Sequence, residues 1–258
     1  MTARSAACFV VLGLLLGACS SIHGERAFAA YMQTSTSGDV SLGPTGGGVA
    51  LDTRQNDFER SLGLDETKPA LNFGGDMATD IGRFGASVLW FDSSGSGTLT
   101  RDFGDIPSGT LVSSKFRFFD AKTWWVYDVV ERPGFRLAPG VAVDFFNMSV
   151  NAITAASPQV FEEVHVFAPV PMLFLDAEAS VDKFTFVGQA GGMRIDLKDG
   201  IGNYWDLEGR VKYAVSDDIG IFAGYRFMSM ASHGDADSRD AFVHVQTTGW
   251  FLGGELSF

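Results

Sequence analysis

The sequence predicts an all-β protein, a closed antiparallel up-and-down transmembrane β-barrel of about ten strands, with eight or twelve as the alternatives. Three observations lead to this fold class. Glycine (31) and phenylalanine (23) far outnumber proline (8) among the 258 residues, and 19% are charged, which is typical of strands rather than helices. The chain starts with an export signal. Several later segments alternate apolar with polar residues at a period of two.

Net charge and cysteine content narrow the classes of partner and site. The formal net charge of −12 argues against a nucleic-acid partner, because nucleic acid selects a basic surface. The two cysteines, Cys8 and Cys19, both lie near the N-terminus, so the rest of the chain has no disulfide framework and no cysteine-ligated metal. No cofactor is predicted. No later stretch of about 18 apolar residues predicts a transmembrane helix.

Residues 1–18 predict a signal peptide. Arg4 supplies the positive charge, and the apolar run that follows is too short to cross a bilayer as a helix. Leu16-Gly17-Ala18-Cys19 resembles the lipobox of bacterial lipoproteins, in which the cysteine is lipidated and becomes the new N-terminus. We therefore expect a lipidated Cys19, a short segment over 19–25 and a barrel over 26–258.

A second cleavage site competes with the lipobox. Ala27-Phe28-Ala29 has the small residues of an ordinary signal-peptidase site, but Glu25 and Arg26 stand directly before it, where charge fits poorly. Either site exports the chain, which is then periplasmic, secreted or part of the outer membrane.

The C-terminal strand favours the outer membrane. It alternates over about ten residues, the length of a tilted membrane strand, and ends on Phe258. A terminal phenylalanine resembles the assembly signal of outer-membrane barrels, so we expect the barrel-assembly machinery as a partner during insertion. The alternation alone also fits a soluble β-sandwich or a lipocalin-like lipoprotein. With the export signal, it favours an integral barrel whose apolar face meets outer-membrane lipid. That face carries Trp250, Leu252, Gly254, Leu256 and Phe258.

Ten segments carry the strand pattern, and their connections alternate in length. The short connections are rich in Asp, Gly and Pro, as periplasmic turns are. Pro169 and Pro171 lack a ladder donor, so a bulge or a miscount is expected there. The strands are predicted over 26–42, 68–77, 83–99, 110–128, 137–154, 160–179, 184–196, 203–215, 219–233 and 241–258. The short turns lie at 78–82, 131–134, 180–183 and 216–218, and the extracellular loops at 43–67, 100–109, 155–159, 197–202 and 234–240.

The longest connection, 43–67, starts with a flexible glycine-rich spacer. Over 56–64 it predicts one or two helical turns capped by Asn56 or Asp57. We interpret the connection as a solvated loop with a few apolar anchors, and a binding loop is the alternative.

Several stretches resemble a family of small, mostly uncharacterised bacterial outer-membrane β-barrel proteins. The likeness covers roughly residues 50–258 and implies a closed barrel in the outer membrane. It brings no catalytic residues. The stretches are Asp57–Glu66, Val88–Asp92, Thr98–Asp102, Ala168–Pro171 and Gly224–Phe227.

Charged residues on the strands are expected to face the lumen, because a basic residue near the middle of the bilayer costs about 2–4 kcal/mol. A barrel of this size has a lumen that side chains nearly fill. The charges therefore predict ion pairs that plug it, for example Arg226 with Glu255, and a narrow polar pore is the alternative. The predicted lumen residues are Asp76, Arg83, Lys115, Arg117, Asp144, Asp176, Glu178, Asp206, Glu208, Arg210, Lys212, Arg226 and Glu255.

A surface enzyme or ligand-binding barrel is the alternative function, built on the last outer loop, His233-Gly234-Asp235-Ala236-Asp237. Asp and His at the rim of such a barrel resemble the omptin proteases, and carboxylates that include Asp240 suit a hard cation. No paired Asp motif and no complete calcium loop accompanies them. A Ser149–His165 pair, of the kind that lipid A deacylases use, is discounted. We interpret the loop as solvated and predict no catalytic or metal residue.

Aromatic residues near the predicted periplasmic turns indicate an interfacial girdle among lipid headgroups. A sugar-binding patch is the alternative. The girdle residues are Trp124, Trp125, Tyr127, Tyr213 and Phe258. The sequence thus predicts an integral outer-membrane barrel with a structural or narrow-pore role, and leaves its oligomeric state open.

Overall fold

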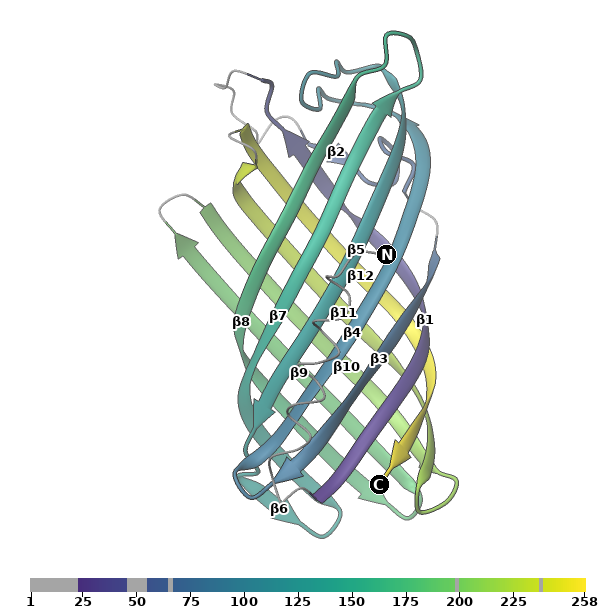
Figure 1. The fold of residues 1–258 in the computed structure, drawn as a ribbon, viewed down its shortest axis with the longest axis vertical. Coiled ribbons are helices and arrows are strands. Elements are labelled where there is room, and N and C mark those ends of the chain that lie inside the picture. Colours follow the sequence, from purple (N-terminus) through teal and green to yellow (C-terminus); the bar gives the residue numbers. More distant parts are fainter. Residues whose placement is uncertain (1–22, 46–54, 65–66, 198–199, 237–238) are drawn as a thin grey trace, which may run out of the picture.

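A computed structural model describes residues 23–45, 55–64, 67–197, 200–236 and 239–258. Ten long antiparallel strands form a closed barrel, which confirms the predicted fold class (Figure 1). The predicted signal peptide and Cys19 lie outside the described residues. The strands are β1 (His23–Leu42), β3 (Lys68–Thr79), β4 (Gly82–Thr98), β5 (Leu111–Val126), β7 (Phe135–Thr154), β8 (Phe161–Val181), β9 (Phe184–Leu197), β10 (Gly200–Ala214), β11 (Ile219–Ala236) and β12 (Arg239–Ser257), with the short β2 (Asn56–Asp57) and β6 (Val130–Arg132) in two connections.

The barrel closes where β12 pairs with β1, in a register that runs from Arg26 opposite Ser257 to Leu42 opposite Ala241. Every other long strand pairs with its neighbours in sequence. The connections at one end are short turns, which marks that end as periplasmic, and the longer ones lie at the extracellular end. No helix in the described part of the chain is long and apolar enough to cross a membrane.

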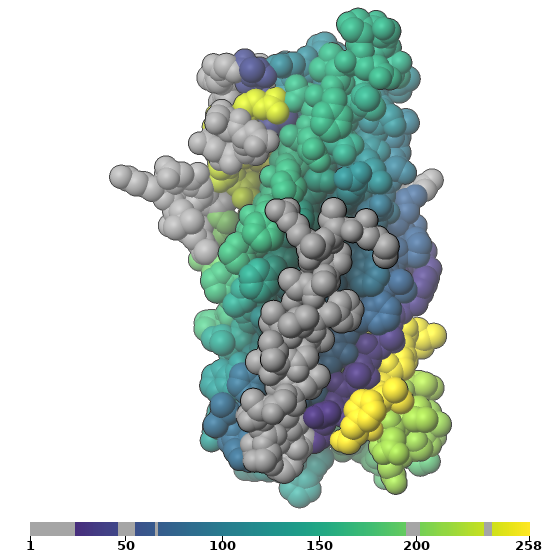
Figure 2. Space-filling model, in the orientation of Figure 1, coloured from purple at the N-terminus to yellow at the C-terminus, as the bar shows by residue number. Residues whose placement is uncertain are grey.

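The outer wall is apolar over most of its height. Leu173, Trp250 and Leu252 are 78%, 71% and 65% exposed, and large apolar side chains are exposed on every long strand. A soluble protein does not expose so much apolar surface, whereas a membrane barrel presents such a band to lipid. Figure 2 shows this wall from outside, with the β7–β8 hairpin rising highest in the view.

Near the extracellular end the wall has the opposite character. On β5, Phe116 and Phe118 are buried inside the barrel, whereas Lys115 and Arg117 lie on the outside. The Lys115 Nζ lies 3.4 Å from a carboxylate oxygen of Asp92 on β4, and both side chains are exposed. The extracellular part of the barrel therefore has an apolar interior and a polar exterior, like a soluble protein.

The polarity reverses part-way along the same strand. Asp120 and Lys122 are buried inside, and Phe119, between them and the extracellular end, is 42% exposed outside. β12 shows the same change, from Val245 buried inside near its start to Leu252 exposed outside near its end. We take this reversal as the level at which the wall passes from water into the membrane.

Two local predictions were wrong. Residues 56–64 form no helix: β2 is followed by tight turns in which the Asp57 carboxylate accepts a hydrogen bond from the Arg60 amide (2.8 Å). β8 has no bulge at Pro169 and Pro171, because its pairing with β7 continues through both. The two prolines instead affect the edge of β8 that faces β9.

Two loops, residues 55–64 and 99–110, pack into the extracellular mouth, and we call them the cap. Phe58 and Phe103 are fully buried, and the Phe58 ring packs edge-on against Phe116 of β5 at 5.5 Å. The predicted apolar anchors of the long loop thus lie inside the barrel mouth. The other buried cap residues are Leu62, Leu64, Leu99 and Ile106.

Gly95 allows the cap to lie against β4. A Cβ at this position would lie 1.8 Å from the carbonyl oxygen of Gly63, so Gly95→Val will push the cap away from the strand. We expect about ten-fold faster cleavage by trypsin after the exposed Arg60, because the loop opens more often. Mass spectrometry of digested outer membranes measures this rate. Gly188→Val is the control, since a Cβ at Gly188 meets no atom within 4 Å; equal rates in the two variants would contradict the prediction.

Candidate functional site: the charged lumen

The centre of the lumen holds Arg226, which is 1% exposed. Its guanidinium donates to both carboxylate oxygens of Asp206 on β10 (2.9 and 2.8 Å) and to Asp120 on β5 (3.1 Å). The residue opposite Arg226 on β12 is Gly249. One arginine thus links carboxylates from opposite sides of the barrel.

Lys122 and Asp144 extend this central cluster. The Lys122 ammonium donates to Asp206 (2.8 Å) and lies 5.4 Å from the centre of the Phe174 ring. Asp144 accepts a hydrogen bond from the Tyr204 phenol at 2.6 Å. Buried charges are tolerated when they are paired and hydrogen-bonded, a condition that Lys122 and Asp206 meet. Asp144 has the Tyr204 hydrogen bond alone, and its second carboxylate oxygen has no hydrogen-bond partner among the described residues.

A second cluster lies nearer the periplasmic turns. Arg26 on β1 contacts Asp76 and Glu178, at 3.0 Å each, and Arg83 contacts Asp76 at 2.5 Å. Arg136 on β7 contacts Glu178 as well (3.0 Å). Carboxylates shared between two arginines tie β1, β3, β4, β7 and β8 together across the lumen. The remaining contacts in this cluster are Arg136 with Asp128 and Asp176, Gln189 with Asp176, Lys212 with Glu255, and Arg210 with Glu208.

We call these inward charged residues together the plug. It consists of Arg26, Asp76, Arg83, Asp120, Lys122, Arg136, Asp144, Asp176, Glu178, Asp206, Glu208, Arg210, Lys212, Arg226 and Glu255. The sequence missed Arg26, Asp120, Lys122 and Arg136. Asp120 and Lys122 carried a usable signal, because they alternate with the uncharged outward residues Phe119, Ala121 and Thr123 of β5.

Three predictions about the lumen and girdle were wrong. Lys115 and Arg117 lie on the outside of β5, above the membrane, where water solvates them. Arg226 does not pair with Glu255: Glu255 lies opposite Gly220, further towards the periplasmic end, and contacts Lys212 instead. Trp124 is not part of a girdle, since it is 7% exposed and packs inside against Phe174.

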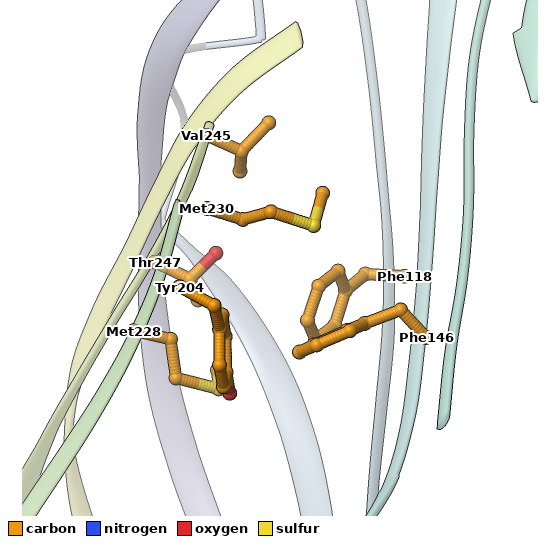
Figure 3. A pocket seen from close by; sticks show the side chains of 7 residues that line it. All are labelled: Phe118, Phe146, Tyr204, Met228, Met230, Val245 and Thr247. Atoms are coloured by element: carbon orange, nitrogen blue, oxygen red, sulfur yellow. The ribbon is translucent and has the colours of Figure 1, made fainter. Parts of the chain in front are cut away.

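A small cavity of about 10 Å³, close to the size of one water molecule, lies between the plug and the apolar extracellular interior. Phe118 and Phe146 line it from one side, and residues of β10, β11 and β12 line it from the other (Figure 3). Phe146 and Tyr204 meet edge to face, with ring centres 4.7 Å apart. The remaining lining residues are Met228, Met230, Val245 and Thr247.

Hydrogen bonds tie the extracellular loops together above this cavity. Glu162 on β8 accepts a hydrogen bond from the Asp105 amide (2.9 Å) and pairs with Arg239 on β12 (2.7 Å). The Asp105 carboxylate in turn accepts hydrogen bonds from the backbone amide and the hydroxyl of Thr45, which lower the pKa of Asp105. These contacts hold the cap over the mouth.

The residues proposed for surface chemistry do not converge. His233 lies exposed on β11, opposite Phe242, and the side chains of Asp235 and Asp237 fall outside the described residues. Ser149 and His165 are directly opposite each other on β7 and β8, but His165 Nε2 contacts the Asn147 amide oxygen (2.8 Å). Among the described side chains no group of His, Cys, Asp and Glu is arranged to hold a metal.

The fold is similar to that of the outer membrane protease OmpT from Escherichia coli, with a TM-score of 0.57 and 11% identity over 93% of this chain and 99% of that chain. The transport unit of the Escherichia coli autotransporter AIDA-I (TM-score 0.43, 9% identity, 95% and 92% covered) and Neisserial surface protein A (0.37, 12%, 93% and 100%) are more distant. No protein-family model and no curated protein matches the sequence. The likeness therefore concerns the fold, which is that of small bacterial outer-membrane β-barrel proteins, as the sequence predicted.

Proposed function

We propose that this integral outer-membrane barrel has a structural, non-conducting role, with its lumen closed by the plug. The observation that carries the proposal is the contact of Arg226 with Asp206 and Asp120, which joins opposite walls at 1% exposure. An ion that crossed the lumen would have to separate these buried pairs, and breaking a buried pair costs about 3–5 kcal/mol. The cap adds a second, apolar barrier at the extracellular mouth.

Planar lipid bilayers test the proposal against the alternative of a narrow pore. We expect that the purified barrel inserts without discrete conductance steps in concentrated KCl, because no water column passes the plug. A general diffusion porin inserted under the same conditions is the positive control. Heat-modifiable migration in SDS verifies that the tested sample is folded. Regular single-channel steps from the folded barrel would sink the structural proposal and favour the pore.

A further inference from the structure

The barrel wall has a notch between β8 and β9. These strands pair only from Leu173 opposite Gly192 down to Val181 opposite Phe184. Residues 161–172 of β8 and 193–197 of β9 have no partner across this boundary among the described residues. Figure 1 shows the extracellular ends of β9 and β10 leaning away from β8. Every other boundary in the described barrel is paired over a longer or equal register.

Pro169 and Pro171 keep this edge of β8 unpaired. Thr154 of β7 donates to the Val160 carbonyl, so even-numbered residues of β8 exchange hydrogen bonds with β7. Odd-numbered residues, including both prolines, therefore direct their backbone nitrogen towards β9. Proline has no N–H to donate there, which is the usual way in which an open edge is protected from pairing.

The inner rim of the notch is apolar. Val166, Ala168 and Val170 of β8 point inward but are only half-buried, unlike the fully buried Val164 beside them. Ala168 lies opposite Phe146 of β7.

The notch lies next to the cavity, because Phe146, which is opposite Ala168, is one of the residues that line the cavity. On its other rim, Met193 of β9 is half-buried and lies opposite Tyr204 of β10. The rings of Phe146 and Tyr204, which line the cavity, thus come from β7 and β10, the strands that pair with β8 and β9 on either side of the notch. Met228 and Met230 on the far side of the cavity are flexible enough to enlarge it.

The outer rim combines apolar residues with one exposed cation. Leu173 at the base of the notch is 78% exposed, and Phe167 on its β8 side is 64% exposed. Across the notch, Arg194 of β9 is exposed and makes no ion pair with the described residues. Trp205, exposed on β10 and opposite Gly192, lies at the level of the base. Aromatic residues of this kind mark the membrane interface.

We propose that the notch admits one hydrocarbon chain of an anionic amphiphile from the outer leaflet, with the chain against Val166, Ala168 and Val170 and the anionic head at Arg194. The cap closes the mouth and the plug closes the lumen, so the side wall is the remaining route to the apolar interior. The medium that surrounds this part of the wall is itself made of such amphiphiles. A membrane lipid and a free fatty acid share the required chemistry. The proposal rests on the cap and the plug as barriers to a hydrocarbon chain, and it does not depend on whether the plug also stops ions.

Native mass spectrometry of the exported barrel in detergent tests the proposal, with palmitate added in one arm and phosphatidylglycerol in the other. We expect one retained adduct in at least one arm, which identifies the source. Pro169→Val/Pro171→Val restores two N–H donors and lets β8 pair with β9, so occupancy falls about ten-fold. Pro139→Val, the same exchange on β7 away from the notch, is the matched control and retains the adduct. Arg194→Gln weakens binding of palmitate but not of the uncharged hexadecanol.

Hydrogen exchange reports separately whether the notch closes, through slower exchange of residues 161–172 in the double variant. Slower exchange with unchanged occupancy would overturn the proposal, as would the absence of adducts from the unmodified barrel in both arms. If exchange does not slow, Ala168→Trp decides, because its ring blocks the inner rim directly. Lower occupancy in that variant supports the notch as the route, and equal occupancy rejects it.

Discussion

Replacing Arg226 with alanine will destabilise the barrel by about 3–5 kcal/mol. The loss arises because Asp206 and Asp120, each 1% exposed at the side chain, keep their charge in the lumen without the cation that both contact. Lys122 contacts Asp206 but forms no hydrogen bond or ion pair with Asp120, so it compensates only in part. Among the single substitutions considered, we expect this one to have the largest effect.

Equilibrium unfolding in urea from lipid vesicles measures this difference, with tryptophan fluorescence as the readout. Arg117→Ala is the matched control: it removes an arginine that lies exposed on the outside of β5, so the free energy of unfolding should stay the same within error. Arg226→Lys keeps the charge but loses the two-oxygen contact with Asp206, and should fall between the two. A loss below about 1 kcal/mol for Arg226→Ala would show that the plug is not held by this residue.

Leu252→Arg will destabilise the barrel in lipid by about 2–4 kcal/mol. Leu252 is 65% exposed on β12, between the outward Trp250 and Leu256, and therefore lies within the band that meets hydrocarbon. A guanidinium at this position has no lumen partner and must reach the headgroups or bring water with it. The same vesicle unfolding experiment measures the cost.

Leu111→Arg is the control for the membrane position. Leu111 is also exposed (54%), but it stands at the extracellular start of β5, beyond the outward Lys115 and Arg117. An arginine there remains in water, so unfolding should change little. Equal costs at the two positions would contradict the assignment of the membrane level.

Much of the architecture could be predicted because a barrel strand carries its own signal. The period of two and the Asp- and Gly-rich turns placed ten strands with bounds close to those of the structure, such as 219–233 against Ile219–Ala236 for β11. The difference at this end arises because β11 and β12 continue as a paired hairpin into the predicted loop, up to Ala236 opposite Arg239. Backbone pairing can extend a strand where side chains no longer alternate.

The lumen residues were predicted less completely because the outside of the wall meets lipid along one part of its height and water along another. The rule that charges face inward holds only where the outside is lipid, and Lys115 and Arg117 lie beyond that region. Because Lys115 and Arg117 were predicted to face the lumen, the odd-numbered side of β5 was taken as the inner one. Asp120 and Lys122, on the even-numbered side, were therefore missed. The local sequence does not say how far a strand rises above the membrane.

The notch had a signal in the sequence, but its consequence depended on a distant strand. Pro169 and Pro171 both lack a backbone N–H donor, and from the local sequence we interpreted this as a bulge within β8. Which edge of β8 the prolines affect follows from the register with β7, and where β9 diverges follows from the hairpin with β10. Neither the affected edge of β8 nor the point where β9 diverges can be predicted from the residues next to the prolines.

The reversal of polarity along β5 and β12 also fixes how deeply the molecule is immersed. Sinking would drag Arg117 towards the acyl tails, and rising would lift the outward Phe119 into water, so vertical displacement is opposed in both directions. The barrel therefore keeps a fixed depth of insertion in the membrane. The β7–β8 hairpin consequently stands at a constant height over the cell surface, where antibodies and other large molecules from outside will reach it first.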